Sequence, residues 1–229
     1  MEALEAAGRP TWFRLGDRDL AMCLVRTERL QAGARLTEAH AEVVRSLGVR
    51  ASVLPMSDAP VRTSVRSGER WVPFQEFMVR ERAALPIDDV RFDGAEDAAP
   101  PAEVLEALAA ARVIVVGPSN PVISIRPILS VPGMADALRA SPAPVVAMSP
   151  VVDGQVVKGP TKPFLEWAGV SADAAGIARY YGDVLDGFVA DEPMDGLDLP
   201  LLQIDTLMAD AERRARVAAE VLAFAEGLR

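Results

Sequence analysis

The stretch VIVVGPSNPVISIRPIL at residues 113–129 decides the fold of this chain. It begins with the apolar, mostly β-branched run VIVVG (residues 113–117), which is typical of a buried strand in a parallel sheet. The loop 118–121 follows directly. Ligands of open α/β sheets bind where such loops leave the carboxyl ends of the strands, so this loop is a candidate binding site.

The composition of the loop suits a phosphate or a nucleotide. Gly117 allows a ligand to approach the backbone closely, and Ser119 and Asn120 supply side-chain donors. The segment that begins at Pro121 opens with free backbone N–H groups. No Gly-Lys-Ser/Thr triplet follows, so the loop is not a Walker loop. The alternative stays open that Ser119 and Asn120 merely cap a helix that follows the strand.

Strands and helices alternate along the chain after residue 100. Apolar runs predict strands at 113–117, 144–149, 184–191 and 201–205. Periodicity and propensity predict helices at 103–111, 133–140, 162–168, 171–181 and 208–228. This alternation indicates an α/β fold with a mainly parallel sheet, flanked by helices, and right-handed crossovers.

The chain before residue 100 has a less regular pattern. It predicts helices at 18–30 and 37–48, and strands at 50–54, 61–67 and 70–79. Residues 83–102 are rich in Ala, Pro and Asp. We interpret them as an exposed connection around a short strand, DDVRF, rather than as a domain boundary. Residues 1–229 are therefore expected to form a single domain.

The composition limits the classes of function. Half of the 229 residues are hydrophobic and a quarter are charged, which is an ordinary balance for a globular protein. Cys23 and His40 are the only residues of their types, which excludes an intramolecular disulfide and zinc sites built from Cys and His clusters. A hydrolase triad would have to use His40, and the sequence has no nucleophile-elbow pattern.

Charge and hydropathy limit the partners. The net charge of −9 argues against nucleic acid, which basic surfaces usually bind, but not against a small anion. The apolar runs are too short to span a bilayer, and the amino-terminal residues lack the layout of a secretory signal. We therefore expect a cytoplasmic protein without a membrane partner.

A charged motif, WFRLGDRDLAM, occupies residues 12–22. The carboxylates of Asp17 and Asp19 would suit Mg²⁺, the usual companion of pyrophosphate chemistry. The same two side chains would also cap the following helix and pair with Arg18 on the surface. The residues alone leave both interpretations open.

Two further loops carry candidate ligand contacts. Ser57 and Asp58 follow the strand predicted at 50–54, and they either line a site or belong to an ordinary loop. Lys158 and Lys162, the only lysines of the chain, flank a Gly-Pro turn. A lysine here would reach a phosphate as a point charge, and a solvated turn is the alternative.

Five motifs together resemble one enzyme family. WFRLGDRDLA, LPMSDAPV, FQEFMVR, GPSNPVISIRPIL and DTLM occur here in its order and approximate spacing. Across essentially all 229 residues, the chain resembles the 2-phospho-L-lactate transferase family of coenzyme F-420 biosynthesis, which in bacteria is described as phosphoenolpyruvate transferase. The resemblance implies a Rossmann-like three-layer sandwich.

The resemblance implies transfer of a phospholactyl or phosphoenolpyruvyl group from a GDP-linked donor to the deazaflavin Fo (7,8-didemethyl-8-hydroxy-5-deazariboflavin). GMP leaves, Mg²⁺ assists, and the enzyme is expected to be a homodimer. One alternative is a nucleotide-sugar-binding regulatory protein of a related family with a similar strand and Gly-Pro loop. Another is an inactive fragment.

The resemblance also implies roles for individual residues. Those expected at the nucleotide are Gly117, Ser119, Asn120, Pro121, Ser124 and Lys162. Those expected as substrate contacts are Arg14, Gly16, Arg18, Ser57 and Asp58. Asp17 and Asp19 are expected to be catalytic and to hold the metal ion.

The chain departs from the family pattern at three places. Family members begin with a strand and a GGTG-type loop, followed by an acidic motif, and Met1 resembles an internal position of that pattern. We therefore expect an amino-terminally truncated domain without the first βα unit. Residues 21–23 read Ala-Met-Cys where the family usually has Ala-Thr-His. Residues 57–59 read Ser-Asp-Ala in place of Ser-Asp-Asp, which removes one carboxylate.

Overall fold

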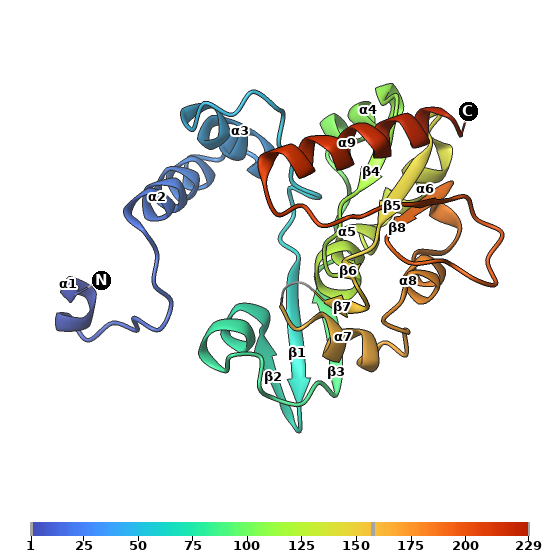
Figure 1. Ribbon diagram of the computed structural model, residues 1–229. Helices are drawn as coiled ribbons and strands as arrows, with labels where there is room; N and C mark the ends of the chain where they lie inside the picture. Colours follow the sequence, from blue (N-terminus) through green and yellow to red (C-terminus); the bar gives the residue numbers. More distant parts are fainter. Residues whose placement is uncertain (1, 157–158, 229) are drawn as a thin grey trace. The chain divides into compact units, whose positions relative to one another are not determined.

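The computed structural model describes residues 2–156 and 159–228, and the chain forms two compact units (Figure 1). The amino-terminal unit is Met1–Val104 and the carboxy-terminal unit is Leu105–Arg229. The single domain expected over 1–229 stays a prediction. Among the described helices, none combines the length and the apolar character that a bilayer crossing needs.

The carboxy-terminal unit is built on a four-stranded sheet in which all neighbouring strands are parallel. The strands follow one another in sequence order across the sheet: β4 (Ile114–Val116), β5 (Val145–Met148), β8 (Gly187–Ala190) and β9 (Leu201–Gln203). The four predicted strands and their parallel arrangement are confirmed. Because the strands are parallel, the loops that follow them meet at one edge of the sheet.

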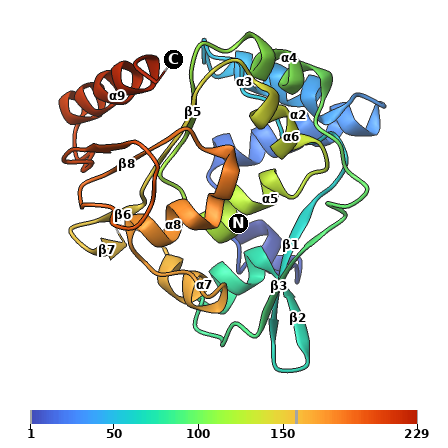
Figure 2. The ribbon, with the colours of Figure 1, turned by 90° about the vertical axis from the view of Figure 1, so that its right-hand side faces the viewer.

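Helices cover both faces of this sheet. The segments are η2 (Pro121–Ile125), α5 (Arg126–Leu129), α6 (Met134–Ala140), α7 (Thr161–Trp167), α8 (Ala174–Tyr181), η3 (Gly182–Val184) and α9 (Ala211–Glu226). In Figure 2, α9 lies on one side of β5 and β8, and α6 and α8 lie on the other. An antiparallel hairpin of β6 (Val151–Val152) and β7 (Gln155–Val156) follows β5.

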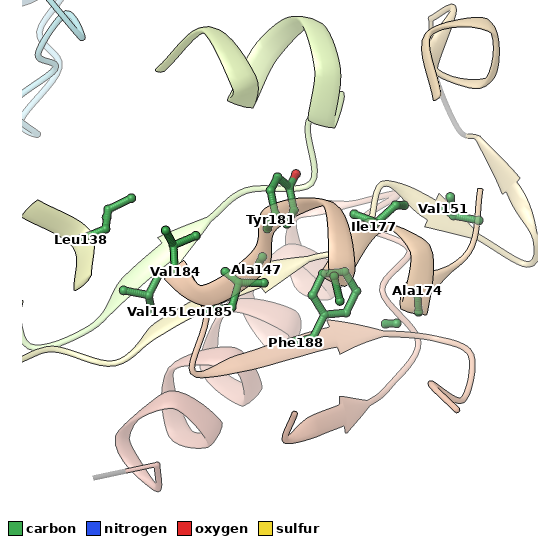
Figure 3. Packing of buried hydrophobic residues seen from close by; sticks show 12 residues of the cluster. Leu138, Val145, Ala147, Val151, Ala174, Ile177, Tyr181, Val184, Leu185 and Phe188 are labelled. Atoms are coloured by element: carbon green, nitrogen blue, oxygen red, sulfur yellow. The ribbon is translucent and has the colours of Figure 1, made fainter. Parts of the chain in front are cut away.

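Strand β5 shows how the sequence produces this layering, because it is buried on both faces. Val145 and Ala147 pack in a cluster with Ile177 of α8 (Figure 3). Val146 alternates with them and packs with Val217 of α9. A strand that is covered on both sides reads as a continuous apolar run rather than as an alternating one. The three-layer arrangement that the resemblance implies is confirmed.

Strand β4 corrects one expectation from the opening motif. The run was predicted to be a buried strand, but β4 lies at the edge of the described sheet and pairs only with β5. Val115 is 40% exposed as a result. Edge and central strands both carry β-branched residues, so the run alone did not distinguish them.

The amino-terminal unit contains helices and a small antiparallel sheet. Its helical segments are α1 (Glu2–Ala6), α2 (Asp17–Gln31), α3 (Leu36–Ser46) and η1 (Glu76–Arg80), and α4 (Ala102–Ala110) spans the boundary between the units. The sheet has the order β2 (Arg70–Pro73), β1 (Arg62–Ser67), β3 (Asp89–Asp93). Val65, Val72 and Val90 form its buried face.

Two strands predicted in this unit are wrong in whole or in part. The strand predicted at 70–79 ends at Pro73, and a π-helical turn, η1, follows. Phe74, Phe77 and Met78 recur at the spacing of a helical face, and Phe77 is fully buried. Residues 50–54 form no strand, and they pair with no other strand among the described residues.

The segment 83–102 is only partly the exposed connection that was predicted. It contains the expected short strand, β3, which pairs with β1. Val90, Ala95 and Ala98 within it are buried. The connection therefore contributes to the core of the amino-terminal unit, because a strand in the middle of it gains a partner.

Candidate functional site

The turn that follows β4 is open to solvent at the carboxyl edge of the sheet. Gly117 and Ser119 are exposed, and a Cβ atom placed on Gly117 would meet no atom within 4 Å. The Ser119 N–H donates to the Gly117 carbonyl over 2.7 Å, which tightens the turn. A ligand can therefore approach this backbone from solvent, as expected for a loop at this position.

Asn120 ends the turn and begins the π-helical segment η2. Its Oδ1 accepts the N–H groups of Val122 (2.9 Å) and Ile123 (3.1 Å). The Ser124 N–H donates to the Asn120 carbonyl over 3.0 Å. The capping interpretation of Asn120 is thus correct, and it means that the first N–H groups of η2 are already occupied.

Asn120 also connects the turn to another predicted site residue. Its Nδ2 donates to Thr161 Oγ1 over 3.2 Å, and Thr161 is a buried residue at the start of α7. Lys162 is the next residue and is exposed. The structure therefore brings Lys162 to the neighbourhood of the turn.

Three other residues that were predicted at or near the nucleotide are less exposed or lie outside the described residues. Pro121 is buried at the first position of η2, and Ser124 is half-buried within it. Lys158 lies outside the described residues. Sequence reasoning missed Thr161, whose contact with Asn120 spans 41 residues and has no local signal.

The charged motif at residues 12–22 begins a helix. Arg14 is exposed, and Gly16 is the N-cap of α2 in an extended conformation. Asp17 and Asp19 lie in the first helical turn and are exposed, where they favour the positive end of the helix dipole. The predicted capping role of Asp17 and Asp19 is wrong, because Gly16 is the N-cap and no side chain among the described residues makes a capping hydrogen bond there, but both carboxylates do lie in the first turn.

The carboxylates of Asp17 and Asp19 do not converge on one point. Two residues apart on a helix differ by about 200° in direction, so their side chains do not face each other. The described residues also contain no group of three or more His, Cys, Asp or Glu side chains that could hold a metal ion. Asp17 and Asp19 therefore form no complete magnesium site by themselves, and their role as metal ligands stays a prediction.

A cavity of about 350 Å³ lies between α2 and α3 in the amino-terminal unit. Its lining residues are Arg18, Ala21, Met22, Val25, Val43, Ser46 and Leu47. One cation, Arg18, thus stands beside a mostly apolar wall. Such a lining suits a ligand that combines an apolar ring with an acceptor or an anionic group.

Ser57 and Asp58 hold the fold together in the amino-terminal unit. Ser57 is buried, and its Oγ accepts the Ala59 N–H over 3.0 Å. Asp58 Oδ1 accepts both the N–H (2.7 Å) and the hydroxyl (2.8 Å) of Thr37, at the start of α3. Asp58 Oδ2 accepts from Arg35 Nη1 over 3.2 Å. These contacts already occupy both side chains. Their role as substrate contacts stays a prediction.

Arg35 extends the Asp58 contacts into a small charged network. Its guanidinium donates to both carboxylate oxygens of Glu103, over 2.6 and 3.3 Å. The hydrogen bond from Arg35 lowers the pKa of the Glu103 carboxyl below its usual value. The network therefore ties the start of α3 to the loop of Asp58 and to Glu103 within one unit.

We expect Asp58→Ala to lower the free energy of unfolding by about 1–3 kcal/mol, because it leaves the partly buried Thr37 N–H and hydroxyl without their acceptor. Asp97→Ala, at an exposed carboxylate of the same unit, is the matched control and should change stability by less than about 0.5 kcal/mol. Urea denaturation followed by circular dichroism measures both. Equal stabilities for the two variants would contradict the structural role of Asp58.

Comparison with known proteins gives one consistent family. Residues 6–215 match the model of the family described as 2-phospho-L-lactate transferase CofD. A phosphoenolpyruvate transferase of Kitasatospora aureofaciens is 43% identical over 96% of this chain and 72% of that protein. A 2-phospho-L-lactate transferase of Methanosarcina mazei is 34% identical over 95% of this chain and 73% of that protein.

The solved structures show the same fold at lower identity. The crystal structure of protein BH3568 from Bacillus halodurans superimposes with a TM-score of 0.61 over 87% of this chain and 70% of that one. The two sequences are 20% identical, so this likeness supports the fold alone.

Proposed function

Because the chain belongs to the 2-phospho-L-lactate transferase family CofD, we propose that it transfers a phospholactyl or phosphoenolpyruvyl group from a GDP-linked donor to Fo. The chain is a transferase, as its relatives are named for 2-phospho-L-lactate or phosphoenolpyruvate transfer. The acceptor Fo, the GDP-linked donor and the place in coenzyme F-420 biosynthesis are the proposed parts.

The proposed reaction is a displacement at phosphorus. The terminal hydroxyl oxygen of the Fo ribityl chain forms a bond to the phosphorus that carries the three-carbon acid. The bond from that phosphorus to the bridging oxygen of GMP breaks, GMP leaves with the electron pair, and the hydroxyl proton is released. The product is a phosphodiester that joins the acid to Fo. Such a reaction depends mainly on positioning and on neutralising charge.

The single observation that carries this proposal is the exposed turn after β4. Its Gly117 backbone is open, its Ser119 hydroxyl is exposed, and Asn120 links it to the helix that begins with Thr161 and Lys162. An exposed hydroxyl and a lysine beside an open turn suit the diphosphate of a nucleotide. We assign the turn and Lys162 to the diphosphate of the donor.

We propose the cavity beside Arg18 as the binding site of the second substrate, Fo. Fo combines a flat ring with a hydroxylated chain, and the cavity between α2 and α3 offers an apolar wall with one cation. We assign Arg14, Gly16 and Arg18 to the Fo side of the reaction, with the Asp17 and Asp19 carboxylates nearby. Asp17 and Asp19 stay the predicted holders of Mg²⁺, which would neutralise charge on the diphosphate when bound.

The proposal is tested by measuring the complete reaction with the full chain of 229 residues. Given Fo and the GDP-linked donor in a buffer with Mg²⁺, the chain should release one GMP for each Fo that is converted, as measured by chromatography. UDP-sugars with the same Fo are the control and should give no product. A folded chain that releases no GMP contradicts the proposal, and tight binding of a UDP-sugar without turnover would favour the regulatory alternative.

A further inference from the structure

One side chain at the turn after β4 connects two segments that are far apart in the sequence. The carboxamide of Asn120 contacts η2 through its oxygen and the start of α7 through its nitrogen. The proposed reaction uses the turn and Lys162, but it assigns no part to Thr161, the buried residue that receives this contact. Thr161 is therefore a candidate for a role that it exerts through Asn120.

The orientation of the Asn120 carboxamide is set by the segment that it begins. Its Oδ1 accepts the N–H groups of Val122 and Ile123, at 2.9 and 3.1 Å, and in an amide group only the oxygen can accept. The Nδ2 group must then face the other way, where it donates to Thr161 Oγ1 over 3.2 Å. The Thr161 hydroxyl is thus the acceptor for a donor whose direction η2 fixes.

The amino-terminal end of α7 is placed by tertiary contacts more than by its own backbone. Its N-cap is Pro160, whose side chain has no polar atom for capping, and the Phe164 N–H reaches the Pro160 carbonyl only at 3.4 Å. A hydrogen bond of that length is weak. Phe164 and Leu165 are fully buried and anchor the helix, and α7 lies in contact with η2. The bond between Asn120 and Thr161 adds a directional polar link to this contact.

The same bond determines where Lys162 begins. Lys162 follows Thr161 directly, and neighbouring Cα atoms are about 3.8 Å apart, so the backbones of these two residues move together. On the other side of the bond, Asn120 ends the turn that contains Gly117 and Ser119. The bond therefore connects the two groups that we assign to the diphosphate, which are the open turn and the lysine.

We propose that Thr161 is a positioning residue of the diphosphate site, an inference that rests on the proposed function. Its hydroxyl holds the Asn120 carboxamide, which keeps the turn and the start of α7 in place before the nucleotide arrives. A site that is ordered before binding loses less conformational entropy when the ligand enters, so it binds more tightly. Because Thr161 is only 3% exposed, it acts through Asn120 and Lys162 rather than by contact with the ligand.

A buried threonine in this place could serve by its shape or by its hydroxyl, and the two roles make different demands on the side chain. A packing role needs the volume and the branched shape, which valine retains. A positioning role needs the hydroxyl oxygen, which serine retains and valine lacks. Comparison of the Thr161→Val and Thr161→Ser variants therefore separates the two roles.

Calorimetric titration of the full chain with GDP tests the proposal. Thr161→Val should weaken GDP binding by about 3- to 10-fold, the range that one neutral hydrogen bond contributes, and Thr161→Ser should stay within about twofold of wild type. Ile177→Val is the control, because it removes a buried methylene group from α8 in the same unit and costs stability by a different route. It should leave the GDP affinity unchanged. Circular dichroism verifies the fold of each variant.

A double-mutant cycle shows whether Thr161 acts through Asn120. Asn120→Ser removes the Nδ2 donor but keeps a side-chain oxygen that caps η2, so it should weaken GDP binding at least as much as Thr161→Val does. The double variant should bind GDP no more weakly than Asn120→Ser alone, because both changes remove the same bond. Effects that multiply in the double variant would make Thr161 independent of Asn120 and overturn the proposal.

The other outcomes separate this inference from the proposed function. A Thr161→Val chain that binds GDP like wild type, or a Thr161→Ser chain that binds it as weakly as Thr161→Val, overturns the role of the hydroxyl and leaves the transferase proposal in place. A wild-type chain that binds no GDP contradicts the GDP-linked donor and this inference with it. If the expected GDP affinities are found but no acid reaches Fo, the proposed reaction fails and the positioning role stands.

Discussion

Replacing Phe188 by alanine is expected to lower the free energy of unfolding by about 3–5 kcal/mol. Phe188 lies on β8, which has a strand on each side, and it is fully buried. Its ring packs in the cluster with Ile177 and Ala147 (Figure 3). Truncation removes the apolar contacts of the ring and leaves a cavity that neighbours on a rigid sheet cannot fill.

Urea denaturation followed by circular dichroism measures this loss. Leu222→Ala is the matched control, because Leu222 lies on α9 in the same unit but is 48% exposed, and it should change stability far less. A Phe188→Ala variant that is destabilised no more than the Leu222→Ala variant would contradict the central position of β8 in the core.

The layered architecture of the carboxy-terminal unit could be predicted because its signals are local. The runs at 144–149 and 184–191 are apolar over several residues, as strands covered on both faces require. The helix predicted at 208–228 matches α9, whose Val217 and Val221 recur at helical spacing and are buried. Each of these patterns is complete within a few residues, so no knowledge of distant partners was needed.

The expectations that failed depend on partners elsewhere in the chain. Whether β4 is an edge or a central strand is decided by its neighbours in the sheet, and its own sequence contains no signal for them. Residues 50–54 contain only Val53 as a β-branched residue, and they have no partner strand among the described residues. In FQEFMVR, the alternation is too short to outweigh the helical spacing of Phe74 and Phe77.

The position of the candidate site could be predicted from the sequence, but the contacts that its side chains make could not be predicted. The turn after Gly117 does lie at the carboxyl edge of a parallel sheet. Asp58, by contrast, is occupied by Thr37 and Arg35, which precede it by more than twenty residues. The contact between Asn120 and Thr161 is likewise long-range. Local sequence patterns identify polar residues in loops, but tertiary contacts determine which of these residues remain available to a ligand.

Replacing Asn120 by aspartate is expected to weaken GDP binding on the order of 2–4 kcal/mol while the fold persists. Aspartate caps a helix as well as asparagine does, so Val122 and Ile123 keep their acceptor. The substitution removes the Asn120 Nδ2 donor to Thr161 Oγ1, which costs about 1 kcal/mol of stability. The change also adds one negative charge beside the turn to which we assign the diphosphate.

The size of this effect follows from electrostatics. Two like charges at about 4 Å in a partly screened site repel each other by roughly 4 kcal/mol, and greater distance or solvent reduces that figure. Ala219→Asp adds the same charge to the exposed side of α9 and should leave GDP affinity nearly unchanged. Calorimetry with GDP at two salt concentrations measures the difference, which should shrink as salt rises. An Asn120→Asp chain that binds GDP as tightly as wild type would place the diphosphate away from this turn, because no rearrangement of a folded turn removes the repulsion of an adjacent carboxylate.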